Sequence, residues 1–124
     1  QKGGLGNGID YMVYCYEHYC TMAIIFMKYV VDIDGTICKT KDSDYENSKP
    51  IKERIQKMNE LFDEGHEIHY WTARGGNSGI NWAVHTKEQF AKWGVKYTTL
   101  AMKKPVYDIW IDDKATNADD FFAK

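Results

Sequence analysis

From residue 28 onward the sequence alternates between segments with a strand pattern and segments with a helix pattern. The strand-like segments are short and rich in aromatic and β-branched residues, whereas the helical ones repeat apolar residues every three or four positions. This alternation predicts an α/β fold, a parallel sheet with helices on both faces. The expected strands are residues 29–31, 67–72, 95–100 and 106–112, and the expected helices are residues 51–64, 81–93 and a short one around 121–122.

The connection between the last two expected strands is unusual. Only a few residues separate 95–100 from 106–112. Parallel neighbours usually need a crossover of a dozen or more residues, most often a helix. Either residues 95–100 do not form a standard parallel strand, or the connection departs from the usual form.

The first 27 residues differ from the rest, and we expect an extension followed by a domain covering residues 28–124. A glycine-rich opening, QKGGLGNG, precedes an aromatic and apolar stretch that Glu17 and His18 interrupt. The stretch is too short to span a bilayer comfortably, and it lacks the basic start and cleavage site of a signal peptide. We expect the extension to add a strand or a helix or to remain loose.

Size and composition indicate one soluble globular domain. The chain has 124 residues, 44% of them hydrophobic and 27% charged, and a formal net charge of −2. This charge gives no general attraction to nucleic acid, and we expect no membrane association. Three cysteines cannot all pair within one chain, so we expect reduced thiols and a cytoplasmic protein. Cys15, His18 and Cys20 could begin a zinc site, but no second pair of ligands follows.

Two aspartates directly after the first expected strand carry the main chemical signal. Asp32 and Asp34 leave the chain on the same side, because side chains alternate between the two faces of a strand. Two like charges this close repel each other unless a cation lies near them. For an isolated pair, a solvated acidic turn is an equally good explanation. The decision therefore depends on the other residues at the same edge of the sheet.

Polar residues also follow the other expected strands. In an open parallel sheet, ligands bind at the carboxyl ends of the strands. The residues expected at that edge are Thr72, Arg74, Lys103, Lys104, Asp112 and Asp113. Acids, a hydroxyl and a lysine from distant segments are thus predicted to meet in one place.

Four motifs, in this order, resemble those of the haloacid dehalogenase superfamily of phosphohydrolases. They are DIDGT, the strand-ending Thr72, the Lys104–Pro105 pair and IDDKATN. Within that superfamily, DIDGTIC, DYENSKPI, the TAR turn and KPVYDIWIDDKA are most similar to the small capsule-biosynthesis phosphatases. The resemblance implies a Rossmann-like sheet. The short spacing between Asp34 and the first helix leaves no room for the cap domain that many members fold over the site.

The resemblance also implies a role for each motif residue. Asp32 would attack phosphorus and form an aspartyl phosphate, and Asp34 would act as general acid and base. Mg²⁺ would be held by Asp32, the backbone carbonyl of Asp34 and Asp113, since this hard ion takes oxygen ligands and keeps several waters. Thr72 and Lys104 would stabilise the transferring phosphoryl group.

Other assignments are supporting ones. Asp112 and Asp113 are adjacent and cannot both point at one ion from a regular strand, so we assign Asp113 as ligand and Asp112 or Asn117 as support behind it. The family pattern alone favours Lys104 over Lys103. Arg74 could clamp an anionic or hydroxyl group of the substrate, or it could be a surface arginine without a function. The residues expected to contact substrate are Gly35, Thr36, Ala73, Arg74 and Lys103.

These observations favour a magnesium-dependent phosphomonoesterase acting on a small phosphorylated metabolite, such as a sugar phosphate of capsule or polysaccharide synthesis. Without a cap, substrate selection must come from short loops or a neighbouring subunit, which suggests a homo-oligomer. A polynucleotide end phosphatase shares the DxDGT start, but the chain has no interleaved basic and aromatic stretch. A third hypothesis is an inactive domain that binds a phosphorylated ligand or partner. The presence of both Asp32 and Asp34 argues against it.

Overall fold

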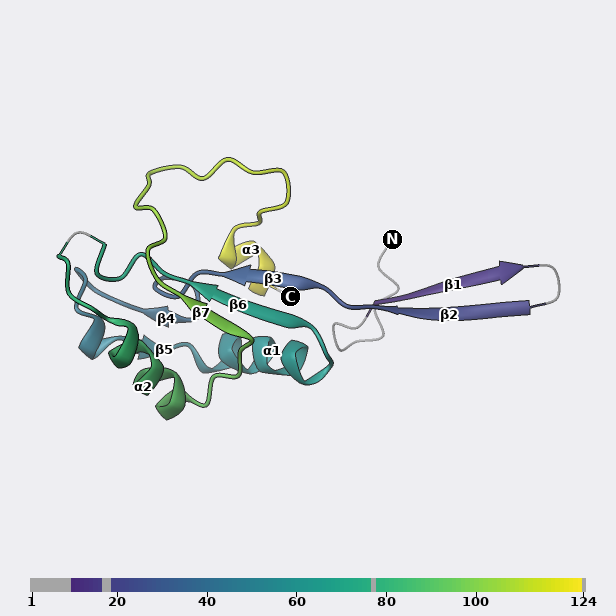
Figure 1. Ribbon diagram of the computed structural model, residues 1–124, viewed down its shortest axis with the longest axis horizontal. Helices are drawn as coiled ribbons and strands as arrows, with labels where there is room; N and C mark the ends of the chain where they lie inside the picture. Colours follow the sequence, from purple (N-terminus) through teal and green to yellow (C-terminus); the bar gives the residue numbers. More distant parts are fainter. Residues whose placement is uncertain (1–9, 17–18, 77, 124) are drawn as a thin grey trace.

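A parallel sheet of three strands forms the centre of the computed structural model (Figure 1). The structure describes residues 10–16, 19–76 and 78–123, with only the backbone for 10–24. The strands are β3 (Lys28–Val31), β6 (Glu67–Trp71) and β7 (Thr99–Ala101), in the order β3-β6-β7. Val31 pairs with Tyr70, which in turn pairs with Leu100. The predicted α/β class with parallel strands is therefore confirmed.

Two helices connect the strands, where the apolar periodicity predicts them. They are α1 (Lys52–Asp63) and α2 (Ala83–Trp93). The buried residues of α1, Ile55, Met58 and Leu61, recur every three residues and form one stripe. After α2 the chain turns at Gly94, whose φ is +71°. Glycine ends a helix readily in this left-handed conformation because it has no Cβ to clash.

Both helices cover the same face of the sheet, so the prediction of helices on both faces is wrong for the described part of the chain. Figure 1 shows α1 and α2 below the sheet. Right-handed crossovers that step in one direction, from β3 to β6 to β7, place both helices on one side. On the covered side Ile68 and Tyr70 are 0% exposed, whereas Val30 on the other side is 70% exposed.

A single apolar core fills the space between this face and the helices. Ile33, Tyr70 and Phe90 are fully buried, and the rings of Tyr70 and Phe90 meet edge to face with centroids 5.0 Å apart. Burying side chains of this size contributes about 1.5–3 kcal/mol each. Because Ile33 points into the core, Asp32 and Asp34 on either side of it point away from the core together.

A small β-ribbon lies between Asp34 and α1. Its strands are β4 (Cys38–Lys39) and β5 (Lys49–Pro50), and a short helical turn, η1 (Tyr45–Asn47), lies between them. The strands are antiparallel, with Cys38 opposite Pro50. This ribbon, which we call the flap, occupies residues 38–50.

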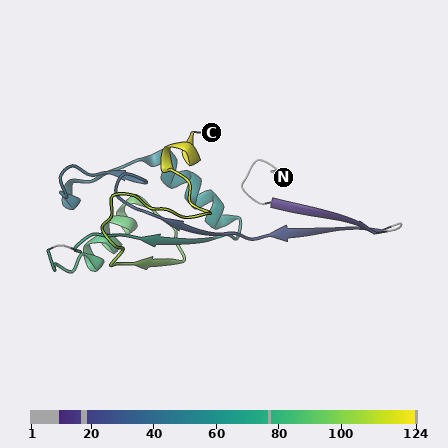
Figure 2. The ribbon, with the colours of Figure 1, turned by 90° about the horizontal axis from the view of Figure 1, so that it is seen from above.

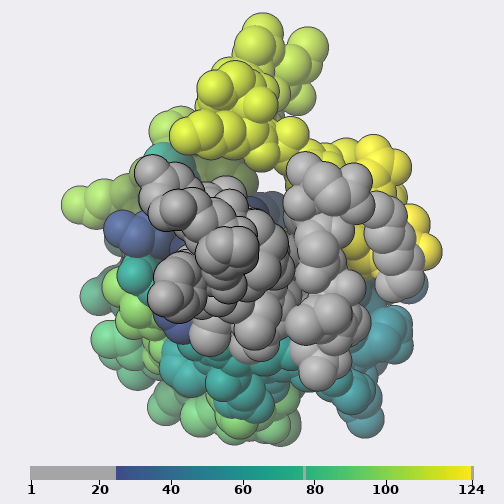
Figure 3. Space-filling view, turned by 90° about the vertical axis from the view of Figure 1, so that its right-hand side faces the viewer, coloured from purple at the N-terminus to yellow at the C-terminus, as the bar shows by residue number. Residues whose placement is uncertain are grey.

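The expected last strand, residues 106–112, does not form. The chain from 102 to 117 has no helix or strand, and Figures 1 and 3 show this segment standing out from the body before α3 (Ala118–Phe122). Ile109 is 78% exposed and Ile111 is 92% exposed. The few residues after β7 cannot provide the crossover that a further parallel strand would need. Instead, Trp110 contacts Trp71 on the open face of the sheet, with ring centroids 5.9 Å apart.

Helix α3 lies beside β3, the first strand of the parallel sheet. In α3 the ring of Phe121 lies 6.0 Å from that of Tyr29, and Asp119 forms a 2.8 Å ion pair with Arg54 of α1. Figure 2 shows α3 next to α1 in the view from above. The predicted short helix with Phe121 and Phe122 is confirmed, and both rings pack against the core.

The part of the extension that the structure describes is an antiparallel hairpin. Its strands are β1 (Asp10–Tyr16) and β2 (Tyr19–Ile25), with Asp10 opposite Ile25. They pair with each other and not with the parallel sheet. The glycine-rich opening and the residues Glu17 and His18 lie outside the described residues. None of the described helices is long and apolar enough to cross a bilayer.

Candidate functional site

A cleft of about 370 Å³ opens at the carboxyl ends of the parallel strands. Residues that follow β3, β6 and β7 meet there with residues of the flap. The lining residues are Asp32, Asp34, Thr40, Ser43, Tyr45, Thr72, Ala73, Arg74, Lys104, Pro105, Val106 and Tyr107. Six residues predicted from the sequence thus line one cavity: Asp32, Asp34, Thr72, Ala73, Arg74 and Lys104.

Asp32 forms an ion pair with a lysine in the cleft. The Nζ atom of Lys104 lies 3.3 Å from Asp32 Oδ1, and the hydroxyl of Thr36 donates a 3.5 Å hydrogen bond to Asp32 Oδ2. The Lys104 side chain is only 11% exposed, while that of Asp32 is 35% exposed. A partly buried lysine offsets negative charge more strongly than one in open solvent. Asp32 is thus an accessible carboxylate with a fixed positive charge beside it.

Asp34 is held in a different way. Arg74 donates two hydrogen bonds to it, from Nε to Oδ2 at 2.9 Å and from NH2 to Oδ1 at 2.8 Å, and Thr40 donates a third to Oδ1 at 2.5 Å. Burial raises the pKa of the Asp34 carboxyl, but the hydrogen bonds from Arg74 and Thr40 and the charge of Arg74 outweigh it. The net pKa lies below its ordinary value, so Asp34 is a carboxylate at neutral pH.

Arg74 is buried, and its guanidinium has protein partners on all three nitrogens. Besides Asp34, NH1 donates to Thr86 at 3.2 Å and to Gln89 at 2.7 Å, both on α2. The guanidinium carbon also lies 4.9 Å from the ring centre of Tyr45. With its side chain 0% exposed, Arg74 orients Asp34 rather than offering free donors to a ligand. The geometry therefore favours an orienting role over the expected substrate clamp.

The turns after the strands place the remaining motif residues. The amide of Lys104 donates to the carbonyl of Thr72 at 3.0 Å, and the hydroxyl of Thr72 accepts from the amide of Arg74 at 3.1 Å. Thr72 is 1% exposed and lines the cleft, and because its hydroxyl oxygen accepts this bond, the hydroxyl proton is not used in it. Lys103 has a φ of +67° and is exposed, so the chain turns there and only Lys104 lines the cleft.

The chain turns directly after Asp34, at Gly35. Its φ is +83°, and the chain then closes a turn in which the amides of Thr36 and Ile37 both donate to the carbonyl of Ile33. Gly35 suits this position because a Cβ would strain the backbone at that φ. Of the five residues expected to contact substrate, Thr36 contacts Asp32 through its hydroxyl and Gly35 shapes the backbone, and neither of these two lines the cleft.

The residues of the carboxyl-terminal motif do not line the cleft. Asp112 and Asp113 are exposed on the segment without regular structure, where Asp112 accepts from the amide of Lys114 at 3.3 Å. Asn117 caps α3, because its Oδ1 accepts from the amide of Asp119 at 2.9 Å. These contacts are local, and the predicted strand that was to bring Asp112 and Asp113 to the sheet edge, residues 106–112, does not form. Among the residues described, no group of three or more histidine, cysteine, aspartate or glutamate side chains is placed to hold a metal ion.

Several cleft residues were not predicted from the sequence. Thr40 and Tyr45 come from the flap, and Tyr107 comes from the segment after β7. On α2, Thr86 is 0% exposed and Gln89 is 8% exposed, and both hold Arg74. The sequence does contain a signal for these two residues. Thr86 and Gln89 lie about one turn apart, on the face of α2 that also carries the apolar Phe90. A polar side chain buried on such a face needs a hydrogen-bond partner.

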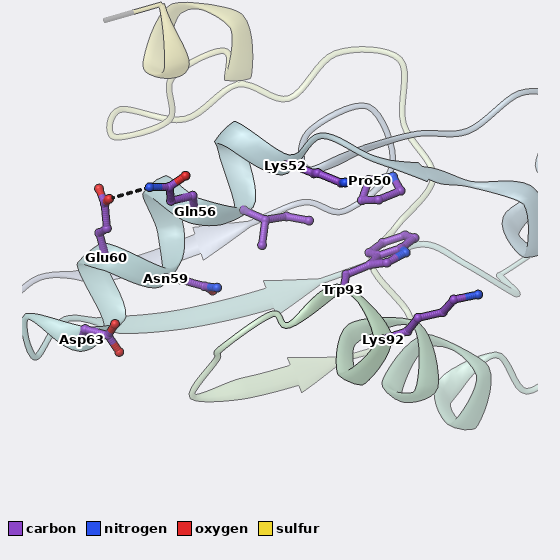
Figure 4. A pocket seen from close by; sticks show the side chains of 9 residues that line it. Pro50, Lys52, Gln56, Asn59, Glu60, Asp63, Lys92 and Trp93 are labelled. Carbon is purple, nitrogen blue, oxygen red and sulfur yellow. Dashed lines mark hydrogen bonds between the residues drawn. The ribbon is translucent and has the colours of Figure 1, made fainter.

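A second, larger cleft lies on the helical side. It has a volume of about 490 Å³ and lies between α1 and α2 (Figure 4). Figure 4 shows Trp93 facing it and Lys52, Glu60 and Lys92 around it, and Gln56 donates to Glu60 at 3.2 Å. Its lining residues include Glu60, Asp63, Lys52 and Lys92, but these form no ion pair with one another. At the strand ends Asp32 and Lys104 do form one, in a cleft that Thr72 also lines, so the strand-end cleft is the candidate active site.

Neither a family model nor a curated protein matches this sequence. A solved structure does: the crystal structure of an MCSG target protein from Vibrio cholerae is 32% identical and superimposes with a TM-score of 0.69. The match covers 77% of this chain and 87% of that one. The chain belongs to the same family as the Vibrio cholerae protein. That protein's name states no activity. Membership of this family therefore supports the fold, and any assignment of a reaction must rest on the residues of the cleft.

Proposed function

We propose that this protein is a phosphomonoester hydrolase of the haloacid dehalogenase type, without a cap domain, in which Asp32 is the nucleophile. The observation that carries the proposal is the 3.3 Å contact between Asp32 and Lys104 in a cleft that Thr72 also lines. A nucleophilic carboxylate needs access to the substrate, and Asp32 is the more exposed of the two paired acids, at 35% against 24% for Asp34.

In the proposed reaction, a carboxylate oxygen of Asp32 bonds to phosphorus while the bond from phosphorus to the leaving oxygen breaks. Water then attacks the aspartyl phosphate, which releases inorganic phosphate and regenerates the carboxylate. Lys104 would offset the negative charge on the phosphoryl group, and Thr72 would donate its hydroxyl proton to a phosphoryl oxygen. Fixed donors of this kind stabilise the transition state most where they need no reorganisation.

Asp34 would act more directly in hydrolysis of the aspartyl phosphate than in its formation. As a carboxylate it can accept a proton from the attacking water. To protonate the leaving oxygen, Asp34 must first take up a proton, and the paired Arg74 opposes this. The proposal therefore assigns Asp34 to base catalysis on the water, and the proton that it takes up there passes to the leaving oxygen of the next substrate. Arg74 and Thr40 fix its orientation.

The donor set fits Mg²⁺, which is often bound by only one or two protein carboxylates and completes its coordination with water. We propose that Asp32 and the backbone carbonyl of Asp34 hold the ion. Asp113, which follows the anchored Trp110 and does not line the cleft, would join them only if residues 111–113 move toward Asp32. When bound, Mg²⁺ would withdraw charge from the phosphoryl oxygens and relieve the repulsion between the two acids.

The proposed substrate is a small phosphorylated metabolite, such as a sugar phosphate of surface-polysaccharide synthesis, handled in the cytoplasm. The flap and the segment after β7 border the cleft, so these short elements would select the substrate. A homo-oligomer in which a neighbouring copy narrows the cleft remains part of the proposal.

One observation favours a second candidate, a domain that binds a phosphorylated ligand without turning it over. Both carboxylate oxygens of Asp34 already have partners, in Arg74 and Thr40, which is the arrangement of a structural ion pair. Such a domain would bind phosphate through Lys104 and Thr72 and release no product.

Release of phosphate from p-nitrophenyl phosphate separates the two candidates. We expect turnover by the wild type with Mg²⁺, loss of turnover on chelation and its return when Mg²⁺ is added back. Asp32→Asn should abolish turnover, whereas Asp120→Asn, an exposed acid on α3, should leave it unchanged. Phosphate binding without turnover by the wild type would favour the binding domain instead.

A further inference from the structure

We propose that Tyr107, with Tyr45, selects the leaving group of the substrate: the two rings favour phosphomonoesters whose leaving group presents a flat apolar face. An aryl ring and the C–H face of a sugar ring share this chemistry. The inference rests on the proposed phosphomonoesterase function for its kinetic test, and a binding test below separates the two.

Tyr107 lines the cleft beside the proposed chemistry. Its ring centre lies 5.1 Å from Nζ of Lys104, and its hydroxyl accepts a 3.4 Å hydrogen bond from the same nitrogen. The same lysine contacts Asp32. Tyr107 is 46% exposed, so much of its surface is available to a ligand. A leaving group on a phosphoryl bound at Asp32 and Lys104 is therefore within reach of this ring.

A row of aromatic rings fixes Tyr107 in place although its segment has no regular structure. Its ring meets that of Trp110 edge to face at 5.0 Å, and Trp110 meets Trp71 of β6 at 5.9 Å. Trp71 also donates from its indole nitrogen to the carbonyl of Met102 at 3.1 Å. Edge-to-face aromatic pairs attract each other beyond the effect of burial alone. The segment is thus anchored to the sheet at the point where Tyr107 borders the cleft.

Tyr45 supplies the second ring, from the flap. It packs on the guanidinium of Arg74 at 4.9 Å and meets Trp82 edge to face at 5.1 Å. Its carbonyl accepts a 2.5 Å hydrogen bond from Gln89. Tyr45 is thus tied to the residues that orient Asp34. The cleft is thus lined by the polar Asp32, Thr72 and Lys104 and by the rings of Tyr45 and Tyr107. This combination fits a phosphate group attached to a ring.

The kinetic test compares phenyl phosphate with ethyl phosphate. Wild type should prefer phenyl phosphate, and Tyr107→Leu, which keeps apolar bulk but loses the flat ring, should lower the ratio of kcat/KM for phenyl over ethyl phosphate by about tenfold. Tyr107→Phe should keep the ratio, because the ring remains. Ile109→Ala, on the same segment and 78% exposed, should also keep it. An unchanged ratio in folded Tyr107→Leu would overturn the inference.

Binding of two non-hydrolysable probes, phenylphosphonate and ethylphosphonate, tests the inference without catalysis. Tighter binding of phenylphosphonate by wild type, lost in Tyr107→Leu, supports the inference even where no phosphate is released and the proposed function has failed. Equal binding of both probes by wild type overturns it, whether or not the protein is a phosphatase and whether or not the variant folds.

Discussion

At Lys104 the turn after β7 brings a positive charge to the carboxylate proposed as nucleophile. Two adjacent lysines cannot be distinguished by sequence spacing alone, because a loop residue can face either way. The structure separates them through the backbone: Lys103 takes a φ of +67°, and the amide of Lys104 bonds to the carbonyl of Thr72. Lys104 thereby enters the cleft, while Lys103 faces solvent.

Replacement of these two lysines should therefore have unequal effects. Lys104→Met should lower kcat for p-nitrophenyl phosphate by about a hundredfold, because a fixed charge that stabilises the transition state is lost. Lys103→Met, the matched control, should change kcat by less than about threefold. A loss of the same size in both variants would show that Lys104 has no special role.

Arg74 shows where inference from the sequence fails at the residue scale. The motif placed it correctly at the end of β6, but its partners Thr86 and Gln89 lie on α2, and no local spacing connects them to it. Asp32 and Asp34 were predictable because both flank one buried residue of the same strand end. Long-range partners of a buried arginine become visible only when the helices are packed.

At the scale of elements, patterns that combine local periodicity with a stop signal predicted α1, α2 and β6 well. The segment 106–112 has the alternation of a strand, yet it forms none. A strand also needs a free sheet edge to pair with and a connection long enough to reach that edge. The sequence of the segment alone indicates neither. The contacts of Trp110 with Trp71 and Tyr107 instead hold the segment on the open face.

Amide hydrogen exchange tests this difference directly. Residues 106–113 should exchange rapidly, because they form no ladder of backbone hydrogen bonds, whereas Glu67–Trp71 in the central strand should be protected. Ile111→Ser should change the free energy of unfolding by less than about 0.5 kcal/mol, since this side chain is 92% exposed. Protection of 106–113 equal to that of β6 would mean that the strand predicted from the sequence exists.

At the scale of the whole molecule, the ion pair between Asp34 and Arg74 joins the first strand end to α2 through Thr86 and Gln89. It therefore contributes to the fold as well as to the site. The pKa of Asp34 is lower in the folded protein than its ordinary value of 3.8. A group shifted in this direction adds stability that is fully present above its unfolded pKa and is lost as the pH falls through the folded pKa.

Acid should therefore destabilise the wild type more steeply than a variant without this carboxylate. As the pH falls below about 4, the free energy of unfolding of wild type should drop faster than that of Asp34→Asn. Urea unfolding at a series of pH values measures both, and the other carboxyl groups act equally in the two proteins. Parallel curves for wild type and Asp34→Asn would show that the ion pair does not contribute to stability.

The account depends most on Asp32 as the residue that takes up the phosphoryl group. Rapid acid quench of the first turnover with p-nitrophenyl phosphate and Mg²⁺, followed by mass spectrometry, measures this directly. We predict a single phosphoryl adduct on the peptide that carries Asp32, sensitive to hydroxylamine, more abundant in Asp34→Asn and absent in Asp32→Asn. Release of phosphate with no adduct on Asp32 in either the wild type or Asp34→Asn would contradict the account.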